Sequence, residues 1–308
     1  MSNKKITALF TVMMLLITAL AVPVSAQSAD LTVIGKLAVV EKAVYGTPQT
    51  GAVADRITKI EEDVYGSETQ EALLPRVDEL YTDVLETSEA TPSMLTKLNS
   101  VEWTLTHSVS DNSIKARIDN LETIMNGSAE AGSLQGRLDK LLQLAYTDGE
   151  VEVASTLIPQ DTLIKIKTLS TLHSKQSRAG DRVALAVAED VYVGNVLVLP
   201  KGSTGSGKVV KVSPRKNFGR DAKLEVSFDT LKTVDGKTIA IFVGEKAEKE
   251  TKSLATAAGA SVAGMIVLGP VGVIGGAFVS GKDVEIPIGS QTYVQTKEDV
   301  EIYGITVN

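Results

Sequence analysis

Residues 53–66 read VADRITKIEEDVYG, and variants of this stretch recur six times between residues 33 and 145. Each copy has a basic anchor residue, and successive anchors are 20, 20, 21, 20 and 20 residues apart: Lys36, Arg56, Arg76, Lys97, Arg117 and Arg137. Apolar residues stand three positions before each anchor and one, four and eight positions after it. Such steps place one narrow apolar seam along a helix. A single unit cannot bury that seam, so the pattern predicts a stacked array of six short helices.

The ends of these helices carry recognisable signals. Gly46, Gly66 and Gly127 are expected at helix C-termini, where the chain needs a left-handed residue. Candidate N-terminal caps of the following helices are Thr50, Ser67, Thr91 and Asp111. The connections are short, about five residues, which favours antiparallel neighbours in a bundle or short superhelix. The seam also has coiled-coil spacing, so association of several chains through it is an alternative.

Charged residues follow the seam at regular positions, for example in Arg56/Glu61 and Arg117/Glu122. We expect them to be surface charges that set the register between units, with a binding face as the alternative.

The first 26 residues have the order of a secretory signal peptide. Lys4 and Lys5 precede an uncharged apolar run at 6–22, and Val24-Ser25-Ala26 follows. This order predicts export and cleavage after Ala26, with an uncleaved membrane anchor as the alternative. The chain has no cysteine, which excludes disulfides and Cys/His zinc sites.

Charge divides the rest of the chain into two parts. Residues 30–150 contain 21 acidic and 10 basic residues, whereas residues 151–308 contain 17 acidic and 19 basic residues. We therefore expect a helical repeat domain at 30–150 and a second domain at 155–308. The acidic array is a poor partner for nucleic acid, and none is predicted.

The second domain alternates apolar and polar residues, which predicts strands of a β-barrel or sandwich. The alternating segments are 162–169, 182–188, 208–212, 224–231, 238–243, 284–294 and 300–307. Three turns share one formula, at 158–162, 199–203 and 286–290, with proline expected at the second turn position.

Residues 253–281 form an uncharged, glycine-rich insertion in this domain. Its small residues have spacings that let helices approach closely in lipid: Gly264, Gly269, Gly272 and Gly276. We expect a membrane-associating helical hairpin that also makes oligomer contacts. One kinked span and a connection packed on the barrel are the alternatives.

A basic segment precedes this insertion. It is a candidate contact for an anionic envelope polymer or lipid head group, and its alternative is a solvated hairpin: Lys208, Lys211, Arg215, Lys216, Arg220 and Lys223.

No signature of an enzyme is present. Residues 202–208 have the spacing of a phosphate-binding loop, but Val209 stands where that motif needs Ser or Thr, and a strand follows instead of a helix. His107 and His173 lack a nucleophile or a metal partner at suitable spacing. We predict no catalytic, cofactor-binding or metal-binding residues.

The second domain resembles the TrbI-type scaffold family, the outer-membrane barrel subunits of conjugation and type IV secretion machines. The resemblance is carried by 157–164, 188–192, 197–203, 286–290 and 298–300. It implies that 253–281 corresponds to a two-helix insertion that crosses the outer membrane in an oligomeric ring. The repeats are similar to those of exported envelope proteins of outer-membraned Firmicutes.

The sequence therefore predicts an α+β multidomain protein with a non-enzymatic scaffold function in the cell envelope. The location is the periplasm and outer membrane of a diderm bacterium, or the cell surface, and the partners are envelope proteins or further copies. A soluble periplasmic or secreted protein-binding module is the alternative.

Overall fold

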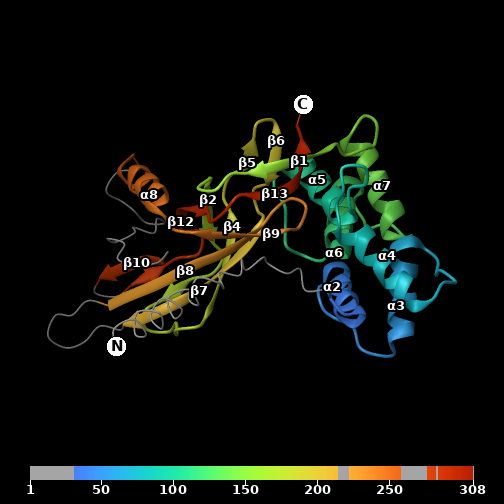
Figure 1. Cartoon of the computed structure of the whole chain (residues 1–308), viewed down its shortest axis with the longest axis horizontal. Helices are drawn as coiled ribbons and strands as arrows, with labels where there is room; N and C mark the ends of the chain where they lie inside the picture. Colours follow the sequence, from blue (N-terminus) through green and yellow to red (C-terminus); the bar gives the residue numbers. More distant parts are fainter. Residues whose placement is uncertain (1–30, 214–221, 258–275, 282–283, 308) are drawn as a thin grey trace, which may run out of the picture.

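The computed structural model describes residues 31–213, 222–257, 276–281 and 284–307. Within these ranges the chain is α+β, with an array of six helices followed by a β-rich region that contains a closed six-stranded barrel (Figure 1). The predicted signal peptide at 1–26 lies outside the described residues.

The six predicted helices of the array are confirmed. Each begins at the apolar residue three positions before its anchor: α2 (Val33–Tyr45), α3 (Val53–Tyr65), α4 (Leu73–Leu85), α5 (Met94–Thr106), α6 (Ile114–Asn126) and α7 (Leu134–Ala145). The residues one and four positions after each anchor are buried in every helix, so the seam faces the core as predicted.

The helix ends agree with the sequence at the C-termini and differ at the N-termini. Gly46, Gly66 and Gly127 are left-handed C-caps with φ of 90°, 90° and 86°. The observed N-caps, however, are Thr32, Ala52, Ala72, Ser93, Ser113 and Ser133. The predicted caps were wrong because each helix begins two to five residues later, after an extended connection.

The helices run parallel within each group of three, so the expected antiparallel arrangement is wrong. Tyr45, the last residue of α2, donates a 2.6 Å hydrogen bond to Asp63 near the end of α3. Lys36, in the first turn of α2, pairs at 2.6 Å with Asp78 in the first half of α4. The seven-residue connection 46–52 spans about 24 Å when extended, enough to return along a helix of about 20 Å.

Two layers of three helices are stacked end to end. Helices α2–α4 form the first layer and α5–α7 the second, and Figure 1 shows α6 and α7 above α2 and α3. A methyl group at Gly46 would lie 3.7 Å from Cβ of Ser113, and one at Gly66 would lie 3.4 Å from Cβ of Ser133. Helix C-termini of the first layer therefore meet helix N-termini of the second, which is the favourable arrangement of helix dipoles.

The β-rich region contains thirteen strands within the described ranges: β1 (Val153–Ile158), β2 (Leu163–Thr168), β3 (Leu172–His173), β4 (Arg182–Val187), β5 (Val191–Val193), β6 (Val196–Leu199), β7 (Thr204–Ser213), β8 (Ala222–Lys232), β9 (Thr238–Phe242), β10 (Gly276–Gly281), β11 (Glu285–Ile286), β12 (Gln291–Thr296) and β13 (Val300–Thr306). Strands β8-β7-β4-β2-β12-β9 close on themselves through the β8–β9 pairing, and β10 extends β8. A second sheet has the order β1-β13-β6-β5, and β3 pairs with β11.

Alternating apolar residues fill the barrel, for example Leu224, Val226 and Phe228 on β8. Residues 204–208 of the apparent phosphate-binding loop lie in β7, where glycine permits close packing on β8. A methyl group at Gly205 or Gly207 would lie about 2 Å from a carbonyl oxygen of β8.

The three proline turns share one geometry. In each, the proline carbonyl accepts a hydrogen bond from the residue three positions later, at 3.3 Å for Pro159, 3.0 Å for Pro200 and 3.2 Å for Pro287. Proline is therefore the first residue of the turn rather than the second. The third residue has a positive φ in every case: 61° at Asp161, 93° at Gly202 and 83° at Gly289.

The glycine-rich insertion is described only at its two ends. Its first residues end helix α8 (Glu245–Ala257), and its last six form β10. The part between them, including Gly264, Gly269 and Gly272, lies outside the described residues. Gly276 begins a strand, so the predicted helical hairpin does not extend to the end of the insertion. None of the helices in the described ranges has the length and apolar character needed to cross a bilayer.

Candidate functional site

Four buried carboxylates organise the array. Each accepts two N–H bonds from an arginine that stands fifteen residues later, on the next helix. The shortest nitrogen–oxygen distances are 2.6 Å for Glu41–Arg56, 2.6 Å for Glu61–Arg76, 2.5 Å for Glu102–Arg117 and 2.5 Å for Glu122–Arg137.

The same carboxylates also hold the connections between helices. Each accepts a backbone N–H from the residue eight positions later, within the returning loop: Gln49 at 2.9 Å, Thr69 at 3.2 Å, Ser110 at 3.0 Å and Glu130 at 2.8 Å. We call each set of glutamate, loop N–H and arginine a clamp. Because all three parts come from consecutive segments, a clamp fixes the register of two parallel helices and the path of the loop.

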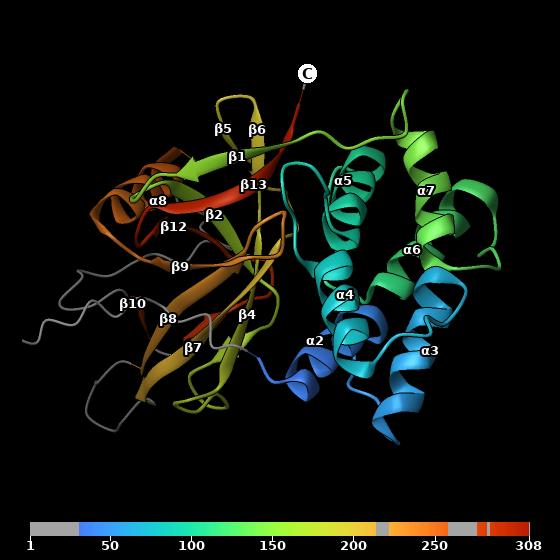
Figure 2. The ribbon, with the colours of Figure 1, turned by 45° about the vertical axis from the view of Figure 1, so that its right-hand side comes forward.

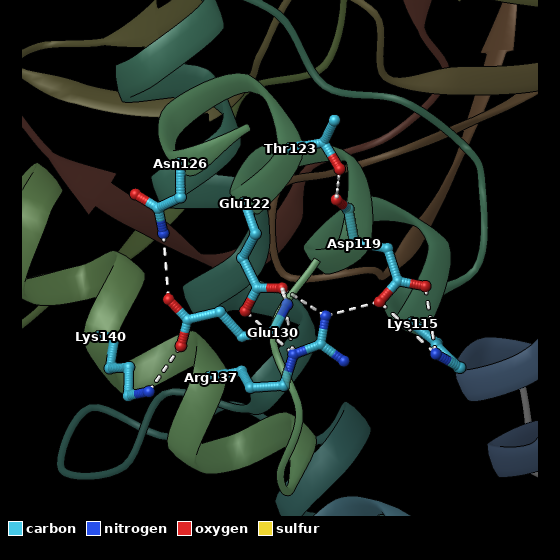
Figure 3. Close-up of polar contacts among 8 residues, drawn as sticks. All are labelled: Lys115, Asp119, Glu122, Thr123, Asn126, Glu130, Arg137 and Lys140. Carbon is cyan, nitrogen blue, oxygen red and sulfur yellow. Dashed lines mark hydrogen bonds and ion pairs between the residues drawn. The ribbon is translucent and has the colours of Figure 1, made fainter. Parts of the chain in front are cut away.

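The last clamp extends into a wider network, shown in Figure 3. Arg137 lies between Glu122 and Asp119 and donates to both, at 2.5 Å each. Lys115 approaches the other oxygen of Asp119 at 3.1 Å. Charge-assisted hydrogen bonds of this kind offset the cost of burying the charged groups.

Burial and hydrogen bonding act in opposite directions on the clamp carboxylates. Burial raises the pKa of Glu61 and Glu122, but hydrogen bonds from Arg76, Arg137 and the loops outweigh it, so both pKa values lie below the ordinary range. Burial is the largest influence on Arg117 and lowers the pKa of its guanidinium. The clamps are thus ionic pairs whose partners depend on each other.

The series of clamps is interrupted between α4 and α5. Tyr81 occupies the position of the glutamate, Lys97 occupies the position of the arginine, and the anchor spacing increases to 21 residues. This is the point where the first layer ends and the second begins. The prediction of surface charges is wrong, because Glu41, Glu61, Glu102 and Glu122 are buried, as are Arg76, Arg117 and Arg137. The signal that was missed is the glutamate five positions after an anchor, which pairs with the next anchor instead of its own.

Helix α5 joins the array to the barrel. Asn99 donates a 2.7 Å hydrogen bond from Nδ2 to the carbonyl of Val234, and its Oδ1 accepts one of 2.7 Å from Arg117. Trp103 donates from Nε1 to Asp190 at 3.0 Å. Asn99 therefore connects the Glu102–Arg117 clamp directly to the β-rich region.

Gly202 allows two backbones to approach closely at this joint, and Gly236 leaves room for the side chain of Leu95. The N–H of Val109 donates to the carbonyl of Lys201 at 2.8 Å. A methyl group on the next residue, Gly202, would lie only 2.0 Å from the Val109 oxygen, and one on Gly236 would lie 2.8 Å from Leu95. Sequence reasoning identified Gly202 as a turn residue and did not reveal this contact.

The predicted anionic-polymer contact is described in part. Lys208 and Lys211 on β7 and Lys223 on β8 are exposed. Lys208 pairs with Arg182 on β4, and Lys211 pairs with Glu225, so these side chains share the outer face of the barrel. Arg215, Lys216 and Arg220 lie outside the described residues. The structure thus adds Arg182 to the basic set, which sequence spacing alone could not place there.

The described fold and joint define a two-part α+β protein in which a clamped helical array is fixed to a closed barrel. Among the described residues, no group of three or more His, Asp or Glu side chains is arranged to hold a metal ion. No family model matches the sequence, and no curated protein matches it. A similar solved structure is ComB10 of the Com type IV secretion system of Helicobacter pylori, with 15% identity and a TM-score of 0.27, over 47% of this chain and 89% of that chain. A likeness of this size carries no argument about function, and the resemblance to the TrbI-type family stays a prediction.

Proposed function

We propose that this chain is a non-enzymatic structural protein of the cell envelope. The observation that carries the proposal is the use made of the buried charges. The four clamp glutamates and their arginines hold helices and loops to one another, and Asn99 extends one clamp to the barrel. These buried ion pairs hold the helices, the loops and the barrel in fixed positions relative to one another. A scaffold protein requires such a rigid arrangement.

The distribution of charge supports the same proposal. Exposed acidic side chains dominate the surface of α3 and α4. Between Asp55 and Glu89, all of which the structure describes, Lys59 is the one basic residue that is exposed. The outer face of the barrel carries Lys208, Lys211 and Lys223. The barrel would contact the anionic envelope surface, and the acidic array would extend away from it.

The signal-like order of residues 1–26 supports export. The glycine-rich insertion, with Gly264, Gly269, Gly272 and Gly276, would contribute the membrane or oligomer contact. Envelope proteins are the proposed partners, and the periplasm with the outer membrane, or the cell surface, is the proposed location.

Cell fractionation tests the proposal. The expected result is an N-terminus at Gln27 and a chain that stays with envelope membranes after a salt wash and is released by detergent. A chain found only in the soluble periplasmic or secreted fraction would overturn the proposal and favour the soluble binding module.

A set of charge reversals tests the basic face separately. The Lys208→Glu, Lys211→Glu and Lys223→Glu combination is expected to weaken sedimentation of the purified chain with anionic lipid vesicles. Lys232→Glu, on an exposed position at the other end of β8, is the control and should leave sedimentation unchanged.

A further inference from the structure

Among the described residues, the apolar seam of the array is buried at the junction between its two layers and more exposed at its two ends. The residue three positions before the anchor is buried throughout the second layer, with exposed fractions of 7% for Met94, 1% for Ile114 and 2% for Leu134. The equivalent Val33 and Val53 of the first layer are half-buried, and Leu73 is 40% exposed. The same sequence position is therefore buried only where another layer lies beneath it.

The opposite end of the seam shows the reverse pattern. The residue eight positions after the anchor is fully buried in the first layer, at Val44, Val64 and Val84. In the second layer Leu105 and Ala145 are only partly buried, and Met125 is 45% exposed. Each end of the array thus presents the apolar residues that the internal junction buries against the other kind of end.

Helix capping also differs between the layers, at two of the three helices. All three helices of the second layer have a serine N-cap whose side chain accepts a backbone N–H. In the first layer Thr32 caps α2 in the same way, whereas α3 and α4 have Ala52 and Ala72 at this position and no side-chain cap. Helix N-termini without a cap have backbone N–H groups that a following set of helix C-termini can satisfy.

We propose that the array continues between chains, with the first-layer end of one copy stacked on the second-layer end of another. The internal junction is the template for this contact. There, Gly46 and Gly66 of the first layer lie against Ser113 and Ser133 of the second, whereas nothing in the described chain lies within 4 Å of a methyl group placed on Gly127. Gly127 ends α6 and would receive the next copy.

The two proposed joining surfaces lie at opposite ends of the array. Figure 2 shows the barrel beside the array, with α2 and α3 toward one end and α7 toward the other. The two joining surfaces differ, so the association is head-to-tail and produces a filament or a closed ring. The inference deepens the proposed scaffold function and gives it a form of assembly.

Light scattering on the purified mature chain, which we expect to begin at Gln27, provides the first test. The average mass is expected to increase steadily with concentration. A mass of one chain at every concentration would overturn the inference. Fractionation tests the envelope location independently, because a monomer can still sediment with membranes and an assembling chain can still be soluble.

Two variants that block one end each provide the decisive test. Leu73→Glu blocks the first-layer end and Met125→Glu blocks the second-layer end, so each variant alone is expected to remain monomeric. A mixture of the two retains one compatible pair of ends and should form a dimer of one copy of each, with no larger species. Ile34→Glu, at a more exposed position of the first-layer end, serves if Leu73→Glu unfolds the array.

The control is Ile288→Glu, an equally drastic change at an exposed position of the barrel region. It is expected to assemble as the unaltered chain does. Assembly by either end-blocked variant alone, or a mixture that stays monomeric, would overturn head-to-tail stacking.

Discussion

The guanidinium of Arg76 in α4 donates two hydrogen bonds to the carboxylate of Glu61 in α3, at 2.9 Å from Nε and 2.6 Å from Nη2. Both side chains are buried, and the same carboxylate accepts the N–H and the hydroxyl of Thr69 in the connecting loop. One side chain therefore joins two helices and the segment between them. The clamp replaces the tight turn that would otherwise set the relative position of two neighbouring helices.

Glu61→Gln is expected to destabilise the array strongly, because it leaves the buried guanidinium of Arg76 without its counter-charge. Breaking a buried ion pair costs about 3–5 kcal/mol. Glu62→Gln is the matched control, since Glu62 is the exposed neighbour in the same helix, and a change within about 0.5 kcal/mol is expected there. Urea unfolding followed by circular dichroism measures both. Equal effects of the two substitutions would show that the clamp does not stabilise the fold.

The clamp carboxylates also predict a loss of stability in acid. The pKa values of Glu61, Asp119 and Glu122 are lower in the folded chain than their ordinary values. The unfolded chain therefore binds more protons as pH falls, and the free energy of unfolding decreases below about pH 4.5 until the folded groups are protonated. Their contribution is fully present at neutral pH.

Unfolding measured at a series of pH values tests this dependence. Glu122→Gln should flatten the decline, because one of the low-pKa groups is removed, while Glu62→Gln should leave most of it. An unchanged pH profile in Glu122→Gln would contradict the assignment of that group.

The helices could be predicted from the sequence because the seam repeats within each helix. The four predicted N-caps nevertheless lie two to five residues before the observed ones. Each of the six barrel strands overlaps an alternating segment, although β7, β8 and β12 extend beyond theirs. The parallel direction could not be predicted, because Tyr45–Asp63 and Lys36–Asp78 join residues on different helices. A short connection usually indicates antiparallel neighbours, and only the buried glutamate explains how these connections return.

The contacts between the array and the barrel could not be predicted from the sequence either. Asn99 and Trp103 read as ordinary helical residues, and their partners Val234 and Asp190 lie about 90 residues or more away in the chain. The closure of the barrel depends in the same way on the pairing of β8 with β9 and β12 with β9. Alternation of apolar and polar residues predicts strands, but tertiary packing determines which strands pair with each other.

Gly202→Ala is expected to disturb the joint beyond the effect of backbone strain. Gly202 and Gly194 both have positive φ, at 93° and 63°, and alanine at either position costs about 1–2 kcal/mol for the left-handed conformation. Only Gly202 faces another backbone, with the Val109 oxygen 2.0 Å from the new methyl group, whereas nothing lies within 4 Å at Gly194. We expect Gly202→Ala to lose about 1–3 kcal/mol more than Gly194→Ala through overpacking. Equal losses in urea unfolding would mean that the two backbones separate without cost.

Trp103 provides a direct measure of whether the array and the barrel unfold together. It is the only tryptophan of the chain, and its Nε1–H bond to Asp190 places it at the joint. In the unaltered chain, its fluorescence and the helical circular dichroism are expected to change in one urea transition.

Asn99→Ala removes the partner of Arg117 and of the Val234 carbonyl, which costs about 1–3 kcal/mol for buried polar groups left unpaired. The fluorescence should then change at a lower urea concentration than the circular dichroism, because the joint opens before the helices melt. Asn120→Ala, at an exposed position of α6, should keep the two transitions together. Coincident transitions in Asn99→Ala would show that the clamp and the barrel are not coupled through this side chain, and that the other contacts of the joint hold the two parts together.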